Sequence, residues 1–375
     1  MKIYFKKYKK TLLLSCIVLA SAIISACGNT NDINLIGVAG TPNPASNNTT
    51  ETNVENPATD LPTATPFPVA SGRIIFVSNR DGQNNLYITS PDGSQVERLT
   101  TNIAEDTTPR ISPDGTRVAY VSTVNNNTDI YIIDLNTRTI MQVTNAPEKD
   151  SSPTWSPDGR QLAFESFRDG NFEIYITNVD GSNQYRLTND PAADTHPVWS
   201  PTSNEIAFVS NRFGNADILL ANTSGNVFTL TTNPAPDNAP AWSPNGSTIA
   251  FQAFSGDLSN LCLIERDGLN LRCATSSPAQ YNPPSWSPDG VWIASSGHNS
   301  AIHLFNTLDG SINQLYITGI EPRSTPYFSR DGLRLVFQAQ FNGDMELFSV
   351  LIPTNQFSQV TSLSGYDGEA IWIDN

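Results

Sequence analysis

The chain has 375 residues, a formal charge of −15, four cysteines and three histidines. Nucleic acid and anionic lipid headgroups are poor partners for a chain of this charge, because like charges repel. Acidic residues also keep an exported, Asn-rich surface soluble, and that interpretation requires no ligand.

Residues 1–26 are predicted to be a lipoprotein signal peptide. Five lysines lie within the first ten residues, and an apolar stretch too short for a convincing membrane span covers residues 11–24. Small residues then precede Cys27, which resembles the lipobox of bacterial lipoproteins. The resemblance implies that Cys27 is acylated and becomes the N-terminus. An ordinary secretory signal with an incidental cysteine is the alternative.

Residues 27–72 are predicted to be the lipidated cysteine and a disordered tether. This segment is rich in Asn, Thr and Pro and has no apolar period, so it cannot bury enough surface to offset the entropy of folding. Removal of the signal takes away five lysines and no acid, which changes the formal charge from −15 to −20.

A repeat of about 43 residues fills residues 73–375. Its marker, Trp-Ser-Pro-Asp-Gly, occurs unaltered at residues 155–159 and 286–290, and weaker copies lie before, between and after them. Each repeat contains four short runs of apolar and β-branched residues, separated by Pro, Gly, Asn and Asp. A four-stranded meander that recurs with this period predicts the blade of a β-propeller.

The number of blades follows from an aromatic column with one member in each repeat. Its members are Ile111, Trp155, Trp199, Trp242, Trp286, Phe328 and Trp372. The chain enters its first repeat at the second strand, and the missing inner strand appears at residues 370–372. We therefore predict an all-β, seven-bladed propeller, closed by the C-terminal strand. The tryptophans can serve as a ligand platform, but their place in every repeat favours packing between blades.

These repeats resemble the TolB-like propeller family over residues 73–375. The resemblance implies the fold but does not specify a function. TolB itself has six blades behind an α/β domain, so its partners do not transfer to seven repeats behind a tether. Peptidases with such propellers keep their chemistry in a separate α/β-hydrolase domain, and this chain has no Gly-x-Ser-x-Gly motif. Some related propellers are sugar-acid lyases that use His and a metal.

Two cysteines remain in the propeller, Cys262 and Cys273. They lie on neighbouring strands at equal distances from an Asp-Gly turn, so a cross-strand disulfide is expected after export, with two free thiols as the alternative. Metal binding by this pair is not expected, since no histidine lies nearby to complete a set of four ligands.

An acidic column lies five residues before the aromatic one, in loops expected at one mouth of the central channel. Its aspartates are Asp106, Asp150, Asp194, Asp237 and Asp367. One interpretation is a ligand-binding ring of carboxylates that holds a cationic peptide or calcium. The other is that each aspartate caps its own turn. Three arginines on the same face, Arg80, Arg168 and Arg212, are alternatively expected to pair with Asp129, Glu173 or Asp217.

The sequence thus predicts a monomeric cell-envelope lipoprotein, lipid-anchored outside the cytoplasm. Its propeller is expected to bind an envelope protein or peptide, without catalysis and without a cofactor other than, at most, calcium. A carbohydrate-active lyase and a purely structural spacer are the alternatives.

Overall fold

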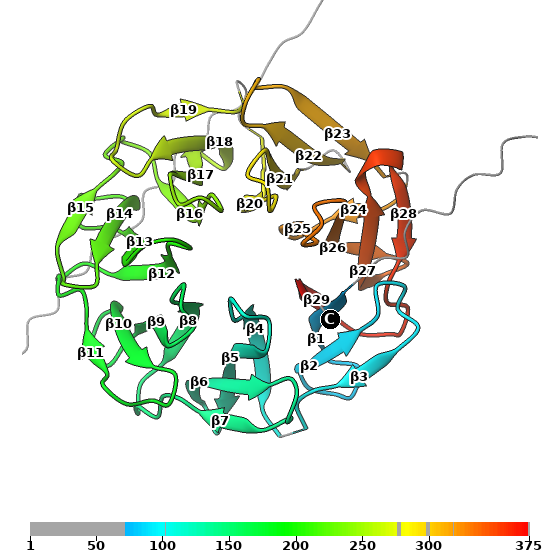
Figure 1. The fold of residues 1–375 in the computed structure, drawn as a ribbon, viewed down its shortest axis with the longest axis horizontal. Helices are drawn as coiled ribbons and strands as arrows, with labels where there is room; N and C mark the ends of the chain where they lie inside the picture. Colours follow the sequence, from blue (N-terminus) through cyan, green and yellow to red (C-terminus); the bar gives the residue numbers. More distant parts are fainter. Residues whose placement is uncertain (1–71, 102, 276–278, 298–300, 318, 374–375) are drawn as a thin grey trace, which may run out of the picture. The chain divides into compact units, whose positions relative to one another are not determined.

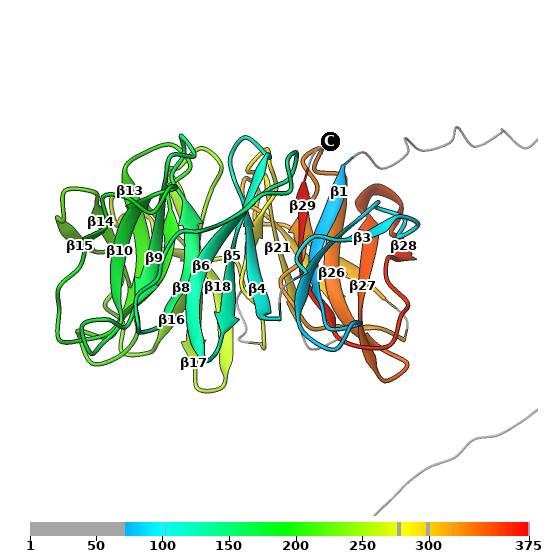
Figure 2. The same ribbon diagram turned by 90° about the horizontal axis from the view of Figure 1, so that it is seen from below.

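The computed structural model describes residues 72–101, 103–275, 279–297, 301–317 and 319–373. These residues form seven antiparallel sheets arranged as the blades of a ring (Figure 1). Seen from the side, the strands of each blade run between the two faces of the ring (Figure 2). The predicted all-β, seven-bladed propeller is confirmed. In the described ranges, no helix is long and apolar enough to span a membrane.

The first four blades each contain four strands, ordered from the inside of the ring outward. Blade 1 consists of β29 (Asp367–Ile373), β1 (Arg73–Ser78), β2 (Asn85–Thr89) and β3 (Val96–Arg98). Blade 2 consists of β4 (Glu105–Ile111), β5 (Arg117–Val124), β6 (Asn127–Asp134) and β7 (Ile140–Gln142). Blade 3 consists of β8 (Asp150–Trp155), β9 (Gln161–Ser166), β10 (Glu173–Asn178) and β11 (Tyr185–Arg186). Blade 4 consists of β12 (Asp194–Trp199), β13 (Glu205–Ser210), β14 (Asp217–Asn222) and β15 (Val227–Thr229).

The remaining blades follow the same order, with shorter inner strands in blades 6 and 7. Blade 5 consists of β16 (Asp237–Trp242), β17 (Thr248–Ser255), β18 (Leu258–Glu265) and β19 (Arg272–Cys273). Blade 6 consists of β20 (Ser285–Trp286), β21 (Trp292–Gly297), β22 (Ala301–Asn306) and β23 (Ile312–Tyr316). Blade 7 has a divided inner strand, β24 (Glu321–Pro322) and β25 (Tyr327–Phe328), followed by β26 (Arg334–Phe341), β27 (Asp344–Leu351), the 3₁₀ turn η1 (Ile352–Thr354) and β28 (Gln356–Gln359).

The ring is closed by the pairing of β29 with β1. Trp372 lies opposite Ile74, and Asp367 lies opposite Ser78 in this antiparallel ladder. The last strand of the chain therefore completes the first blade, as predicted, and covers an edge that would otherwise expose unpaired backbone groups.

The aromatic column packs between blades, which accounts for its recurrence. The indole Nε1 of Trp155 donates to the backbone oxygen of Arg110 in blade 2 at 2.9 Å. Trp242 and Trp286 make the same bond to the preceding blade, at 3.0 Å in both cases. Side chains of neighbouring blades also form joint apolar clusters, one of which joins Ile132 of blade 2 to Phe164 of blade 3. Contact between blades therefore supplies the core.

A bulge interrupts the inner strands of blades 1 to 5. In each of them the second residue after the aspartate has a positive φ, between 48° and 56°: Thr108, Ser152, His196, Ala239 and Glu369. In blades 2 to 5 the next residue is a proline, which has no N–H to offer the ladder, so the strand bends at this point. The register with the second strand shifts at the same place.

Candidate functional site

The five aspartates of the acidic column lie at the start of the inner strands, and each is 0% exposed. Asp150 pairs with Ser166 across the ladder, and Asp194 with Ser210, so each carboxylate lies beside the turn between the second and third strands. This placement at one face of the ring agrees with the sequence. The burial does not agree with a ring of carboxylates open to solvent.

An arginine from that turn pairs with the aspartate in blades 1, 3 and 4. In blade 3, Arg168 Nη2 lies 2.9 Å from Asp150 Oδ2, while Arg168 Nε donates to Ser166 Oγ at 2.8 Å. The guanidinium also lies over the ring of Tyr175, 4.4 Å from its centroid. The corresponding ion pairs are Arg80–Asp367 at 2.9 Å and Arg212–Asp194 at 2.7 Å. These three carboxylates are neutralised inside their own blades.

Blades 2 and 5 lack the arginine, and other polar groups contact their aspartates. Ser122 Oγ donates to Asp106 at 2.5 Å, and Asn233 Nδ2 donates to Asp237 at 3.1 Å. Burial raises the pKa of Asp237 to about 6, because no cation offsets the cost of removing its charge from water.

Of the two interpretations of the acidic column, a ligand-binding ring open to solvent does not agree with the complete burial of its members, Asp106, Asp150, Asp194, Asp237 and Asp367. Their side chains are the buried partners of arginine, serine and asparagine side chains in the same blade or in the loop that leads into it. Among the described residues, no group of three or more His, Cys, Asp or Glu side chains is placed to hold a metal ion. The column has the geometry of a structural element that orders the turns at one face.

Replacing Asp237 by asparagine is expected to stabilise the protein at pH 7.5 by up to about 2 kcal/mol. The folded-state pKa is raised from 3.8 to about 6, so the carboxyl favours folding only while protonated, and its contribution is lost as the pH rises through 6. Urea midpoints at pH 4.5 and 7.5 check this. The gain at pH 4.5 should be only about a third of the gain at pH 7.5, because the folded-state carboxyl is protonated at pH 4.5 while that of the unfolded chain is still mostly ionised. An equal gain at both values would contradict it.

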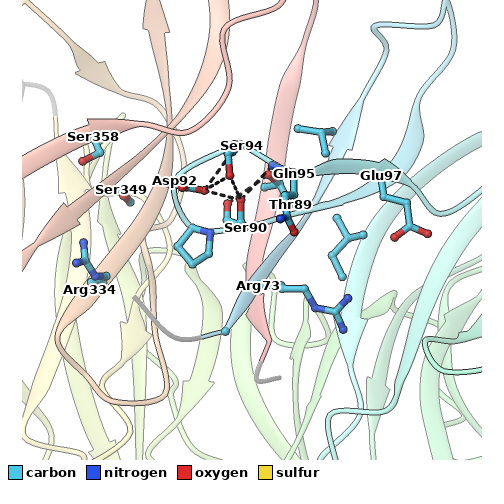
Figure 3. A pocket seen from close by; sticks show the side chains of 14 residues that line it. Arg73, Thr89, Ser90, Asp92, Ser94, Gln95, Glu97, Arg334, Ser349 and Ser358 are labelled. Atoms are coloured by element: carbon cyan, nitrogen blue, oxygen red, sulfur yellow. Dashed lines mark hydrogen bonds between the residues drawn. The ribbon is translucent and has the colours of Figure 1, made fainter. Parts of the chain in front are cut away.

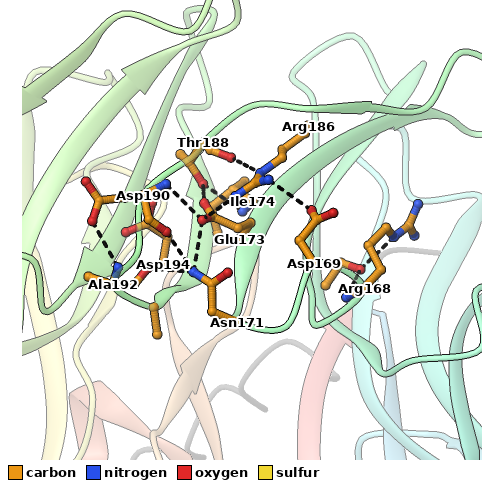
Figure 4. Close-up of polar contacts among 12 residues, drawn as sticks. Arg168, Asp169, Asn171, Glu173, Ile174, Arg186, Thr188, Asp190, Ala192 and Asp194 are labelled. Atoms are coloured by element: carbon orange, nitrogen blue, oxygen red, sulfur yellow. Dashed lines mark hydrogen bonds and ion pairs between the residues drawn. The ribbon is translucent and has the colours of Figure 1, made fainter.

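A second set of buried carboxylates begins the third strands. Glu173 accepts hydrogen bonds from Thr188 Oγ1 at 2.6 Å and from Arg186 Nη2 at 2.7 Å, as Figure 4 shows. Thr188 Oγ1 in turn accepts from the backbone N–H of Ile174. The alternative pairing of Arg80, Arg168 and Arg212 with Asp129, Glu173 or Asp217 is therefore wrong. The three arginines reach back to the inner strand instead.

The turns between inner and second strands form what we call the Pro-Asp-Gly face. In blade 3, Ser156 Oγ donates to Asp158 at 2.6 Å, and the N–H of Gly159 donates to the backbone oxygen of Ser156 at 2.9 Å. Gly159 has φ 67°, a conformation that glycine adopts without strain. These bonds recur around the ring and make the turns a rigid frame.

A cavity of 470 Å³, which we call the mouth cavity, lies between the inner strands and this face. Blades 1, 2, 3, 4 and 7 contribute to it. Its walls include Arg110, Ile111, Pro113, Trp155, Pro157, Trp199, Pro201, Phe328, Arg330, Trp372 and Ile373. The sequence did not predict this site, because the loops that vary between repeats, where recognition was expected, lie on the opposite face.

A second cavity of 240 Å³, the wall cavity, lies along the inner strands of blades 7, 1 and 2. It shares Arg110 with the mouth cavity. Tyr327 and Ile371, which directly precede the mouth residues Phe328 and Trp372 in the sequence, also line it. Glu369 also lines it, and its carboxylate accepts the N–H of Thr108 at the bulge of the next blade. Arg110 therefore lines both cavities.

A larger cavity of 820 Å³ lies between blades 1 and 7, on the outer side of the closure (Figure 3). Arg73, Arg334 and several hydroxyls line it, and its rim includes Gly72, the first described residue. Asp92 accepts from Ser90 Oγ at 2.5 Å, and the bonds from Ser90 and Ser94 lower the pKa of Asp92 to about 2. The carboxylate of Asp92 is thus held by hydrogen bonds within its own turn.

The remaining predicted site residues lie apart from these cavities. Cys262 and Cys273 face each other across the outer ladder of blade 5 and are joined by a disulfide bond. Cys27, the signal peptide and the tether lie outside the described residues.

Comparison with known proteins gives one family match and several structural neighbours. Residues 70–309 match the model of the TolB beta propeller domain. A TolB homolog of Chlorobaculum tepidum is 44% identical over 46 residues, which span 12% of this chain and 11% of that relative. The matched stretch is thus only about a tenth of the relative's length.

Two solved structures illustrate the fold. TolB from Acinetobacter baumannii superimposes with a TM-score of 0.57 at 23% identity, over 81% of this chain and 67% of that chain. An oligogalacturonate lyase in complex with manganese superimposes with a TM-score of 0.64 at 16% identity, over 76% of this chain and 87% of that chain. At these identities the likeness concerns the fold alone.

Proposed function

Because the chain belongs to the TolB beta propeller domain family, we propose that it is a cell-envelope protein whose propeller binds a segment of another protein. The observation that carries the proposal is the mouth cavity. It combines a 470 Å³ hollow, aromatic and proline walls and two arginines on a frame of rigid turns. Recognition sites commonly have this composition, in which an apolar wall gives affinity and a few polar groups give orientation.

The proposal treats the protein as a binding module without catalysis. The oligogalacturonate lyase shares the fold, so a lyase is the second candidate. A lyase of that type requires a set of metal-ligating or acid–base side chains at the cavity, and the described walls of the mouth cavity contain no His, Cys, Asp or Glu. A binding module fits these walls better.

We also propose that the propeller lies outside the cytoplasm and is lipid-anchored through Cys27. The Cys27→Ala variant is expected to lose lipid attachment and to accumulate as an unprocessed or soluble form. Membrane fractionation and intact mass check this. Release of a normally processed, lipid-free protein by the parent itself would contradict the anchor.

The mouth cavity is tested by filling it. Ile111 occupies a position that holds tryptophan in five other blades, so Ile111→Trp should fold while it occupies part of the hollow. In a pull-down from envelope extract with the full-length protein, this variant is expected to lose the partner that the parent captures. Phe213→Ser, a change of a 57% exposed side chain at the opposite face, is expected to retain it. The reverse pattern would place binding on the opposite face.

A further inference from the structure

The mouth cavity differs in charge from the rest of the protein. The chain carries a formal charge of −15, yet two arginines, Arg110 and Arg330, line this cavity, and none of its described lining residues is acidic. The buried aspartates of the inner strands do not alter this balance, because they lie at the other ends of those strands and are engaged there. A ligand in the cavity meets cationic groups on an otherwise acidic protein.

Arg110 is the central group of this arrangement. It lines both the mouth cavity and the wall cavity, and its side chain is exposed. Its Nη1 donates to the backbone oxygen of the adjacent Pro109 at 3.0 Å, and no ion pair between described residues includes Arg110. By contrast, Arg80, Arg168 and Arg212 are each paired with a buried carboxylate.

Glu369, the acidic residue among the described residues that line the wall cavity, forms no ion pair with Arg110. Glu369 directs its carboxylate to the N–H of Thr108, which the bulge turns toward blade 1. A guanidinium offers five donors in a planar fork that matches a carboxylate. Arg110 therefore has donors left for an external anion.

The apolar part of the cavity favours a peptide over a sugar. The indoles of Trp155, Trp199 and Trp372 are only 5 to 9% exposed, so little ring face is available for a sugar ring to stack on. Ile111 and the turn prolines instead give an apolar rim that suits aliphatic or aromatic side chains. The Nε1 of Trp372 is buried without a hydrogen-bond partner, unlike that of Trp155, so the wall retains an unsatisfied donor.

We propose that the mouth cavity binds an extended, acidic peptide segment and that Arg110 holds one of its carboxylates. This inference rests on the proposed function and names the chemistry of its partner. It replaces the cationic peptide expected from the acidic column, because those aspartates are buried and paired.

The test is an array of peptides of equal length and graded net charge, probed with the full-length protein. The parent is expected to bind peptides enriched in Asp and Glu, and Arg110→Gln to weaken that binding about tenfold, the usual effect of losing one charge-assisted hydrogen-bonding group. Arg160→Gln is the matched control, since Arg160 is an exposed arginine on the same face that does not line the cavity. It should bind like the parent.

The outcomes separate the inference from the proposed function. A preference for Lys-rich or neutral peptides, or equal binding by the parent and Arg110→Gln, would overturn the acidic-peptide inference. The proposed function as a binding scaffold would be unaffected. If an oligogalacturonate displaces the bound peptides less well than a Glu-rich peptide does, the result supports the inference. If the oligogalacturonate binds in an Arg110-dependent way and the peptides do not, the inference is overturned. Failure to bind any peptide or envelope protein would overturn both.

Discussion

Deleting residues 366–375 is expected to unfold the protein or make it aggregate. The deletion removes β29, and with it the inner strand of blade 1 and the buried side chains of Ile371, Trp372 and Ile373. Each large apolar side chain contributes about 1.5–3 kcal/mol through burial, and a folded domain has only about 5–15 kcal/mol in total. Loss of the strand also exposes the backbone of β1 as an open edge.

Thermal melts and size-exclusion chromatography check this prediction. A deletion of residues 374–375 alone is the control, because it leaves β29 complete, and it should melt with the parent. A longer deletion with an unchanged midpoint would contradict closure of the ring by β29.

Replacing Asp150 by alanine is expected to cost about 3–5 kcal/mol, because the change leaves a largely buried arginine without its counter-charge. Asp150 is 0% exposed, and the Arg168 side chain that it pairs with is 22% exposed. Denaturant unfolding measures the loss. Glu97→Ala is the control, since it breaks the ion pair between Glu97 and Arg138, whose side chains are 58% and 34% exposed, and should cost less than about 1 kcal/mol.

Two further measurements decide between ion pairing and ligand binding at this position. The double change Asp150→Ala with Arg168→Met should cost clearly less than the sum of the two single changes, as expected for direct partners. Millimolar calcium or a lysine-rich peptide, at constant ionic strength, should leave the midpoint of the parent unchanged. A rise in midpoint that disappears in a variant with Asp150→Asn and Asp194→Asn would restore the cation site.

The fold was predictable because it is encoded locally and repeatedly. The Trp-Ser-Pro-Asp-Gly motif and its weaker copies fix one turn in most blades, and their period gives the number of blades. Closure of the ring could also be predicted, since the inner strand that is missing before residue 73 is found at residues 370–372. The short inner strand of blade 6 was not foreseen. There Pro283 and Pro284 remove two backbone donors in succession, and β20 begins only at Ser285.

The environment of the acidic column could not be predicted from the sequence, because burial is a tertiary property. A signal for the pairing was nevertheless present. Asp150 and Arg168 are 18 residues apart, and so are Asp194 and Arg212. Asp367 meets Arg80 from 287 residues away, through ring closure alone. An arginine at a fixed offset from an acid indicates a pair within the repeat unit.

Arg110 differs from the residues at the same position in the other repeats. The residue before the aromatic position is Thr154, Val198, Ala241, Ser285, Tyr327 or Ile371 in the other repeats, and it is an arginine only in blade 2. A single charge among seven equivalent positions that line a ring is a candidate recognition residue. The cavity around it was not predictable, because it depends on how five blades pack at the centre.

Site-specific photocrosslinking in the native envelope tests the central claim, that the partner binds at the mouth cavity, most directly. A photoreactive amino acid is placed at Pro113, an exposed residue of the cavity rim, or at Phe213 on the opposite face. Irradiation of the Pro113 variant is expected to give a discrete protein adduct that is lost in the Ile111→Trp background, and the Phe213 variant is expected to give none. An adduct at Phe213 without one at Pro113 would contradict the claim.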